Sequence, residues 1–164
     1  MQPIIWTERM SVGVKLLDND NKKLILLINH LHDGLVSERA KPELDRIFQR
    51  LIRSTRVHFA HEEHLLLETG YPGAMAHKQE HDRLLKQVDE LYQRFRAGVP
   101  LSIYIDGMDI LEDWLANHLF GSDQKYGPFL EARGVNWILT SWEIPAEALH
   151  HKPDVQSHAS PAAS

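Results

Sequence analysis

The chain has 164 residues, of which 43% are apolar, a net charge of −5 with neutral histidines, and no cysteine. This length and composition fit one domain with a sizeable core, and the lack of cysteine excludes disulfides, thiolate metal sites and thiol catalysis. No Lys/Arg cluster marks a nucleic-acid surface, and no apolar run is long enough for a membrane span or a signal peptide. We therefore expect a cytoplasmic protein without nucleic-acid or membrane partners.

Residues 1–17 are predicted to form an N-terminal arm without regular structure. Ile4, Ile5 and Trp6 are large apolar side chains near its start, and we expect them to pack on the domain. Gly13 interrupts any regular pattern before the first helix.

The first helix is predicted over residues 19–37. Asp18 stands at the N-cap position, ahead of apolar residues at three- and four-residue spacing, namely Leu24, Leu27, Ile28, Leu31 and Leu35. Extending this track back by three positions from Leu24 reaches Asn21. Asn21 is therefore expected to face the core.

The second and third helices are predicted over residues 42–68 and 74–97. Pro42 suits the first turn of a helix, and Gly98 is typical of a helix C-terminus. The turn at residues 71–73 is short, so the two helices are expected to pack antiparallel to each other.

The fourth helix is predicted to start after a cap at Ser102, and its apolar stripe of Met108, Leu111 and Leu115 leads to His118. Four amphipathic helices with short connections predict an all-α protein, an antiparallel up-down four-helix bundle over residues 18–134. No pattern of strands competes with this prediction.

Residues 135–164 are predicted to be a C-terminal extension of the bundle. Trp137 and Trp142 are expected to cover the end of the bundle. From about residue 146 the extension is rich in Pro, Ala and Ser, a composition that cannot bury a core, and we expect disorder there.

Polar side chains interrupt the core faces of three helices. His58 and Glu62 are four residues apart on the inward track of the second helix, and His77 and His81 are four apart on the third. His118 follows the fourth stripe, and Asp123 stands just beyond it. Buried imidazoles and carboxylates need a partner, which is either a hydrogen-bonded network or a metal.

This donor set fits a pair of borderline transition metals such as iron, zinc or copper, because imidazole suits these ions and carboxylates can bridge them. It argues against calcium and magnesium, which prefer shells of oxygen. It also contains more nitrogen than a ferritin-type carboxylate site.

Several motifs together closely resemble the hemerythrin family, particularly bacterial single-domain hemerythrins. They are the run His58-Phe59-Ala60-His61-Glu62-Glu63, the turn Tyr71-Pro72, His77 with His81, and Trp114-Leu115-Ala116-Asn117-His118 followed by Asp123 and Tyr126. Trp6, Val12-Gly13-Val14 and Leu31-His32 extend the resemblance over roughly residues 4–130. An up-down bundle is the fold of myohemerythrin.

The resemblance implies a cofactor of two iron ions, with a bridging oxo or hydroxo group, that binds dioxygen or a similar small ligand reversibly. Transferred position by position, His77, His81 and His118 would hold one iron and His58 would help to hold the other. Glu62 and Asp123 would bridge the two. The family has a second histidine on the dioxygen-binding iron, contributed by the first helix.

The position of that histidine is Asn21 in this chain, in the run Leu17-Asp18-Asn19-Asp20-Asn21. Asn21 can ligate weakly through its carbonyl oxygen, leave its place to water, or hydrogen-bond a bound species. Asp18 or Asp20 are alternative ligands. Each option leaves this iron with fewer nitrogen ligands, and the second iron is expected to be weakly held or absent.

Three functions follow from this departure. The chain is expected to bind dioxygen as a carrier, store or sensor; the alternatives are a di-iron oxidase or peroxidase and a one-metal relative with impaired dioxygen binding. We favour a binding protein over an enzyme, because no nucleophile motif, phosphate loop or cofactor fingerprint names an organic substrate. An enzyme would be an oxidoreductase using dioxygen or peroxide. A monomer is expected.

Overall fold

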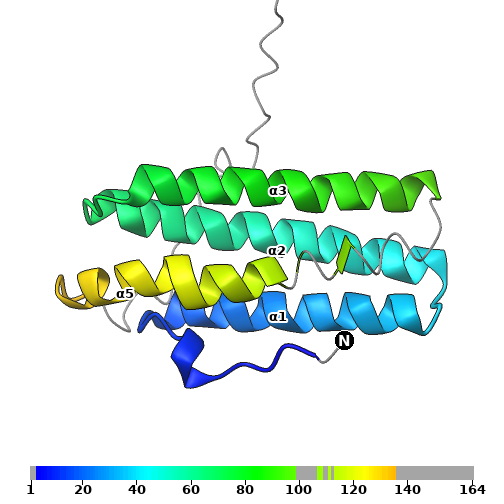
Figure 1. The fold of residues 1–164 in the computed structure, drawn as a ribbon, viewed down its shortest axis with the longest axis horizontal. Coiled ribbons are helices and arrows are strands. Elements are labelled where there is room, and N and C mark those ends of the chain that lie inside the picture. Colours follow the sequence, from blue (N-terminus) through cyan, green and yellow to red (C-terminus); the bar gives the residue numbers. More distant parts are fainter. Residues whose placement is uncertain (1–2, 99–106, 109–110, 112, 136–164) are drawn as a thin grey trace, which may run out of the picture.

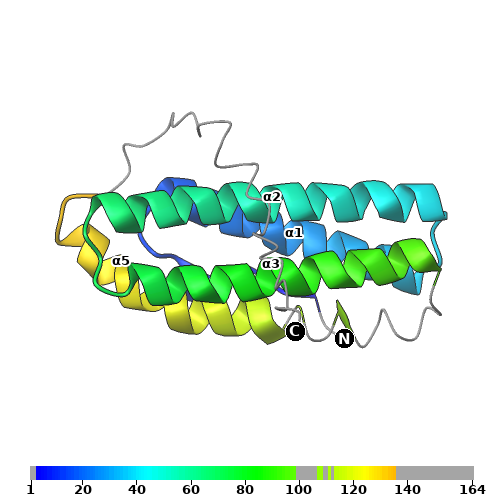
Figure 2. The same cartoon turned by 90° about the horizontal axis from the view of Figure 1, so that it is seen from above.

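The structure is a computed structural model that describes residues 3–98, 107–108, 111 and 113–135. Three long helices, α1 (Lys15–Val36), α2 (Lys41–Glu68) and α3 (Ala74–Ala97), lie side by side (Figures 1 and 2). Residues 113–117 are also helical and continue into the short π-helix η2 (His118–Ser122) and then α5 (Asp123–Glu131). No helix of the described part is long and apolar enough to cross a membrane.

Contacts between neighbouring helices show their antiparallel order. Asp20 near the start of α1 pairs with His61 near the end of α2, and Arg56 of α2 pairs with Asp89 of α3. The predicted four-helix arrangement is therefore confirmed, and the predicted bounds of the second and third helices are correct to within one residue. The predicted cap at Ser102, the two tryptophans of the extension and the tail from about residue 146 lie outside the described residues.

The prediction that Asp18 caps the first helix is wrong. The helix begins earlier, at Lys15, and the side chain of Asp18 accepts hydrogen bonds from the Ser11 hydroxyl at 2.6 Å and the Val12 backbone N–H at 2.9 Å. Asp18 thus fixes the arm to α1. It has the chemistry of a capping residue, but the groups it satisfies belong to the arm.

The arm is more ordered than predicted. It contains a short 3-10 helix, η1 (Glu8–Met10), and the predicted irregular segment also includes the first three residues of α1. Ile4 and Trp6 pack against the core, as expected. Ile5 does not, because 73% of its surface is exposed between these two inward-facing neighbours.

The interior consists of two apolar clusters with a polar layer between them. One cluster includes Leu24 of α1, Leu51 of α2, Val88 of α3 and Leu115. The other includes Leu17, Leu65, Ala74, Tyr126 and Leu130 at the opposite end. Between them lies a layer that includes seven of the buried polar side chains: Asn21, His58, Glu62, His77, His81, His118 and Asp123.

We predict that Asp18→Ala lowers the free energy of unfolding by about 1–3 kcal/mol, because it leaves the Val12 N–H and the Ser11 hydroxyl without their acceptor. Urea denaturation followed by circular dichroism measures this change. Asp33→Ala is the control on the same helix, since the Asp33 side chain is largely exposed, and it should change the free energy by no more than about 0.5 kcal/mol. Equal losses in the two variants would contradict this role of Asp18.

Candidate metal centre

Helical spacing in α2 and α3 directs four side chains into the polar layer. His58 and Glu62 are one turn apart on the buried face of α2, and His77 and His81 are one turn apart on the buried face of α3. All four are buried. The inward orientation predicted for them from the apolar stripes is therefore confirmed.

A local π-helix explains how His118 and Asp123 reach the same layer. Side chains five residues apart point in different directions on an α-helix, since each residue turns the helix by about 100°. Over His118–Ser122 the backbone follows π-helical hydrogen bonding, in which the N–H of Asp123 bonds to the His118 carbonyl. This i to i+5 geometry puts both side chains on one face.

Four donor groups form a nitrogen-rich half of the site: His77, His81, His118 and Glu62, with donor atoms within 4.8 Å of one another. The Nε2 atoms of His81 and His118 are 3.2 Å apart. Glu62 Oε1 contacts His77 Nε2 and lies 3.8 Å from His81 Nε2. Three imidazole nitrogens and one carboxylate oxygen thus converge on one point.

A second group, formed by His58, Glu62 and Asp123, lies beside the first. Glu62 belongs to both groups, because its Oε2 is 3.1 Å from His58 Nε2 while its Oε1 faces the α3 histidines. Asp123 Oδ1 lies 3.0 Å from His118 Nε2 and 3.5 Å from His77 Nε2. Both carboxylates therefore contact both halves of the site.

The two buried carboxyl groups have opposite pKa shifts. Burial alone would raise the pKa of Glu62, but hydrogen bonds from His58 and His77 outweigh it, and the pKa is lowered. Burial raises the pKa of Asp123 well above its usual value, and the nearby Glu62 adds to the effect. The protein itself thus stabilises Glu62 as a carboxylate, whereas Asp123 favours its neutral form unless a cation compensates the charge.

Burial also keeps two of the imidazoles neutral. It lowers the pKa of His81, and it lowers the pKa of His118 to about 3. A neutral imidazole has a lone pair available for a metal ion, whereas a protonated one has none.

Carboxylates behind these histidines orient the rings. His81 Nδ1 lies 3.0 Å from Glu63 Oε1, so a proton on Nδ1 leaves the Nε2 lone pair facing inward. Glu80 Oε2 is 3.4 Å from His118 Nδ1 in a similar position. The contribution of Glu80 was not predicted, because its partner lies 38 residues away.

Asn21 is fully buried in the same layer. Neither atom of its side-chain amide has a hydrogen-bond partner among the described residues. The two nearby aspartates are already bonded elsewhere: Asp20 to His61 at 2.6 Å, and Asp18 to the arm. The pairing of Asp20 with His61 was not predicted, since it joins two helices.

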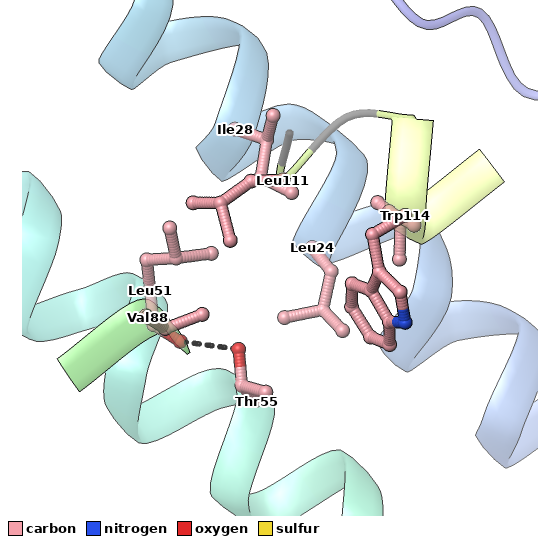
Figure 3. A pocket seen from close by; sticks show the side chains of 8 residues that line it. Leu24, Ile28, Leu51, Thr55, Val88, Leu111 and Trp114 are labelled. Atoms are coloured by element: carbon pink, nitrogen blue, oxygen red, sulfur yellow. Dashed lines mark hydrogen bonds between the residues drawn. The ribbon is translucent and has the colours of Figure 1, made fainter. Parts of the chain in front are cut away.

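A small apolar cavity lies next to this layer (Figure 3). It is lined by Leu24, Ile28, Leu51, Thr55, Val88, Leu111, Trp114 and Leu115. Thr55, the one polar side chain among them, donates its hydroxyl proton to the Leu51 carbonyl at 2.9 Å. The wall is therefore largely apolar. Its residues Leu24, Thr55 and Leu115 are each three positions along the chain from a member of the polar layer, namely Asn21, His58 and His118 respectively.

The fold and the layer define a four-helix protein with a buried histidine and carboxylate cation site. The family model described as "Hemerythrin HHE cation binding domain" matches residues 12–130, and the chain belongs to the hemerythrin family.

Individual sequence and structural relatives agree with this assignment. A bacteriohemerythrin of Stenotrophomonas maltophilia is 33% identical over 132 residues, which cover 80% of this chain and 84% of the relative. A bacteriohemerythrin of Methylococcus capsulatus is 32% identical, over 80% of this chain and all of the relative. The crystal structure of a wild-type hemerythrin superposes with a TM-score of 0.71 at 30% identity, covering 77% of this chain and 97% of that one.

We predict that the metal-free protein loses stability as the pH falls from about 6.5 toward 3, in part through His118. Its folded-state pKa of about 3 lies below the ordinary 6.5, so the unfolded chain binds a proton first and acid favours unfolding. The free energy of unfolding, measured at several pH values, should fall less steeply in His118→Leu. A constant difference between the two proteins at all pH values would contradict this assignment.

Proposed function

We propose that the chain binds two iron ions in this layer and uses them to bind dioxygen. The observation that carries the proposal is that both buried carboxylates, Glu62 and Asp123, contact both halves of the donor set. A carboxylate in that position can bridge two ions. His77, His81 and His118 would hold one ion, and His58 would help to hold the other.

The protein's part in this chemistry is to orient its ligands and to exclude water. When bound, the iron pair supplies the electrons for dioxygen binding. Phe59 stacks on the face of the His81 ring at 3.7 Å between centroids, and Glu63 bonds the Nδ1 atom of that ring. The apolar cavity beside the layer suits a small apolar gas better than water or an ion.

A second candidate function rests on Asn21. If this residue replaces the usual histidine, the nearby ion has one nitrogen ligand fewer and is held less tightly. Such a site favours the entry of water and oxidation of the metal over reversible binding. The chain would then be an oxidoreductase that consumes dioxygen or peroxide, or a relative that retains one metal.

We predict that protein reconstituted anaerobically with ferrous iron forms a coloured adduct in air, and that removing the gas under argon restores the colourless ferrous protein. An ultraviolet-visible spectrum through repeated cycles measures this. Permanent oxidation in the first cycle, with turnover of an added reductant or peroxide, would favour the enzyme. No adduct and no oxidation would contradict both functions.

We predict that Glu63→Gln weakens iron binding about 10–100-fold, because it removes the negative charge that orients and strengthens His81 as a ligand. Competition with a coloured chelator measures the affinity. Glu68→Gln is the matched control, since Glu68 is exposed on the same helix. The role of Glu63 would be disproved by equal affinities in the two variants.

A further inference from the structure

We propose that the two halves of the site are chemically unequal, and that the half containing His58 and Asn21 is an oxygen-rich site that accepts manganese(II) in place of a second iron. Asn21 is the residue that sets this selectivity. The inference rests on the proposed two-metal function, and it concerns which ion occupies one of the two positions.

The register of all four helical segments places Asn21 at the level of the metal ligands. In α1 it lies between Leu17 of one apolar cluster and Leu24 of the other. His58 and Glu62 occupy the same interval in α2. Figure 3 shows Leu24 and Thr55 on the wall of one cavity. Leu24 is three residues after Asn21, and Thr55 is three residues before His58.

The amide of Asn21 is a buried polar group that still lacks a partner. Burying an amide without hydrogen bonds is costly, yet both its oxygen and its nitrogen are unpaired among the described residues. His58 Nδ1 and both Asp123 oxygens are likewise buried without a hydrogen bond in the described part of the chain. A cation with its water ligands would satisfy the oxygens of this half.

The other possible ligands on α1 are already engaged. Asp20 bonds His61 at 2.6 Å, and Asp18 holds the arm through two hydrogen bonds. Neither carboxylate is available without breaking these contacts. The α1 contribution to the second half is therefore the carbonyl oxygen of Asn21.

The two donor sets then differ in hardness. One offers three imidazoles with a share of Glu62 and contacts to Asp123, and the other offers one imidazole and the same two carboxylates. In our proposal the amide oxygen of Asn21 completes the second set. Carboxylate and carbonyl oxygens suit manganese, whereas imidazole strengthens the advantage that iron has over manganese in the ordinary affinity order. A carbonyl oxygen in place of an imidazole in the His58 half therefore reduces the preference for iron over manganese in that half.

The test is competitive metal loading of the full chain. Metal-free protein is incubated without oxygen in an equimolar excess of ferrous iron and manganese(II), desalted, and analysed for both metals by mass spectrometry. The parent is compared with Asn21→His, which restores a nitrogen ligand, and with Asn21→Asp, which keeps an oxygen ligand. Asn19→His is the matched control, since Asn19 is exposed on the same helix.

We expect the parent, Asn21→Asp and Asn19→His to retain manganese together with iron. Asn21→His should shift the retained manganese-to-iron ratio toward iron by about tenfold or more, since even a change behind a ligand alters metal affinity 10–100-fold. If Asn21→His does not fold, as judged by circular dichroism, the comparison of Asn21→Asp with Asn21→Ala decides. The Ala variant should then lose the second metal.

Two outcomes would overturn the proposal separately from the function it rests on. Two irons per chain in the parent, with the same ratio in Asn21→His, would disprove the selectivity and leave the two-metal function standing. One metal per chain in the parent under saturating iron and manganese would disprove both. An unchanged second metal in Asn21→Ala would show that the amide oxygen is not a ligand.

Discussion

The structure depends on one constraint, which is that seven polar side chains share a single buried layer between two apolar clusters. Carboxylates and imidazoles lose their hydration there, and burial is tolerable only if they face each other or a cation. The apolar stripes on either side supply the stability of the fold. The polar layer reduces that stability, because it keeps polar groups away from water, as is common at a functional site.

Several local features serve this layer. The π-helix turns Asp123 onto the face of His118, and without it a spacing of five would direct the carboxylate away. Glu63 bonds the outer nitrogen of His81, and Glu80 lies 3.4 Å from the outer nitrogen of His118, while the inner nitrogens of the two rings face one another. Asp20 and His61 join α1 to α2 at the same level. The geometry of the cluster is thus fixed by contacts between helices as well as by contacts among its own members.

The chain belongs to the hemerythrin family, and we propose that its ligand set departs from that of the family at Asn21. Asn21 is as deeply buried as the histidines around it, so the side chain at this position still faces the interior. One group of donors contains three histidines, whereas the group around His58 contains no second histidine among the described residues.

The sequence by itself determined the helical stripes, the turn at residues 71–73 and the inward direction of Asn21, His58, Glu62, His77 and His81, because spacing of three and four fixes which side chains share a helical face. It failed at Asp18 and Ile5, where the path of the arm decides. Only the tertiary structure decided which donors meet: the π-turn, the shared contacts of Glu62 and the pairing of Asp20 with His61 join residues 4 to 41 positions apart. Such contacts depend on how the helices pack against one another, and periodicity within one helix carries no information about that.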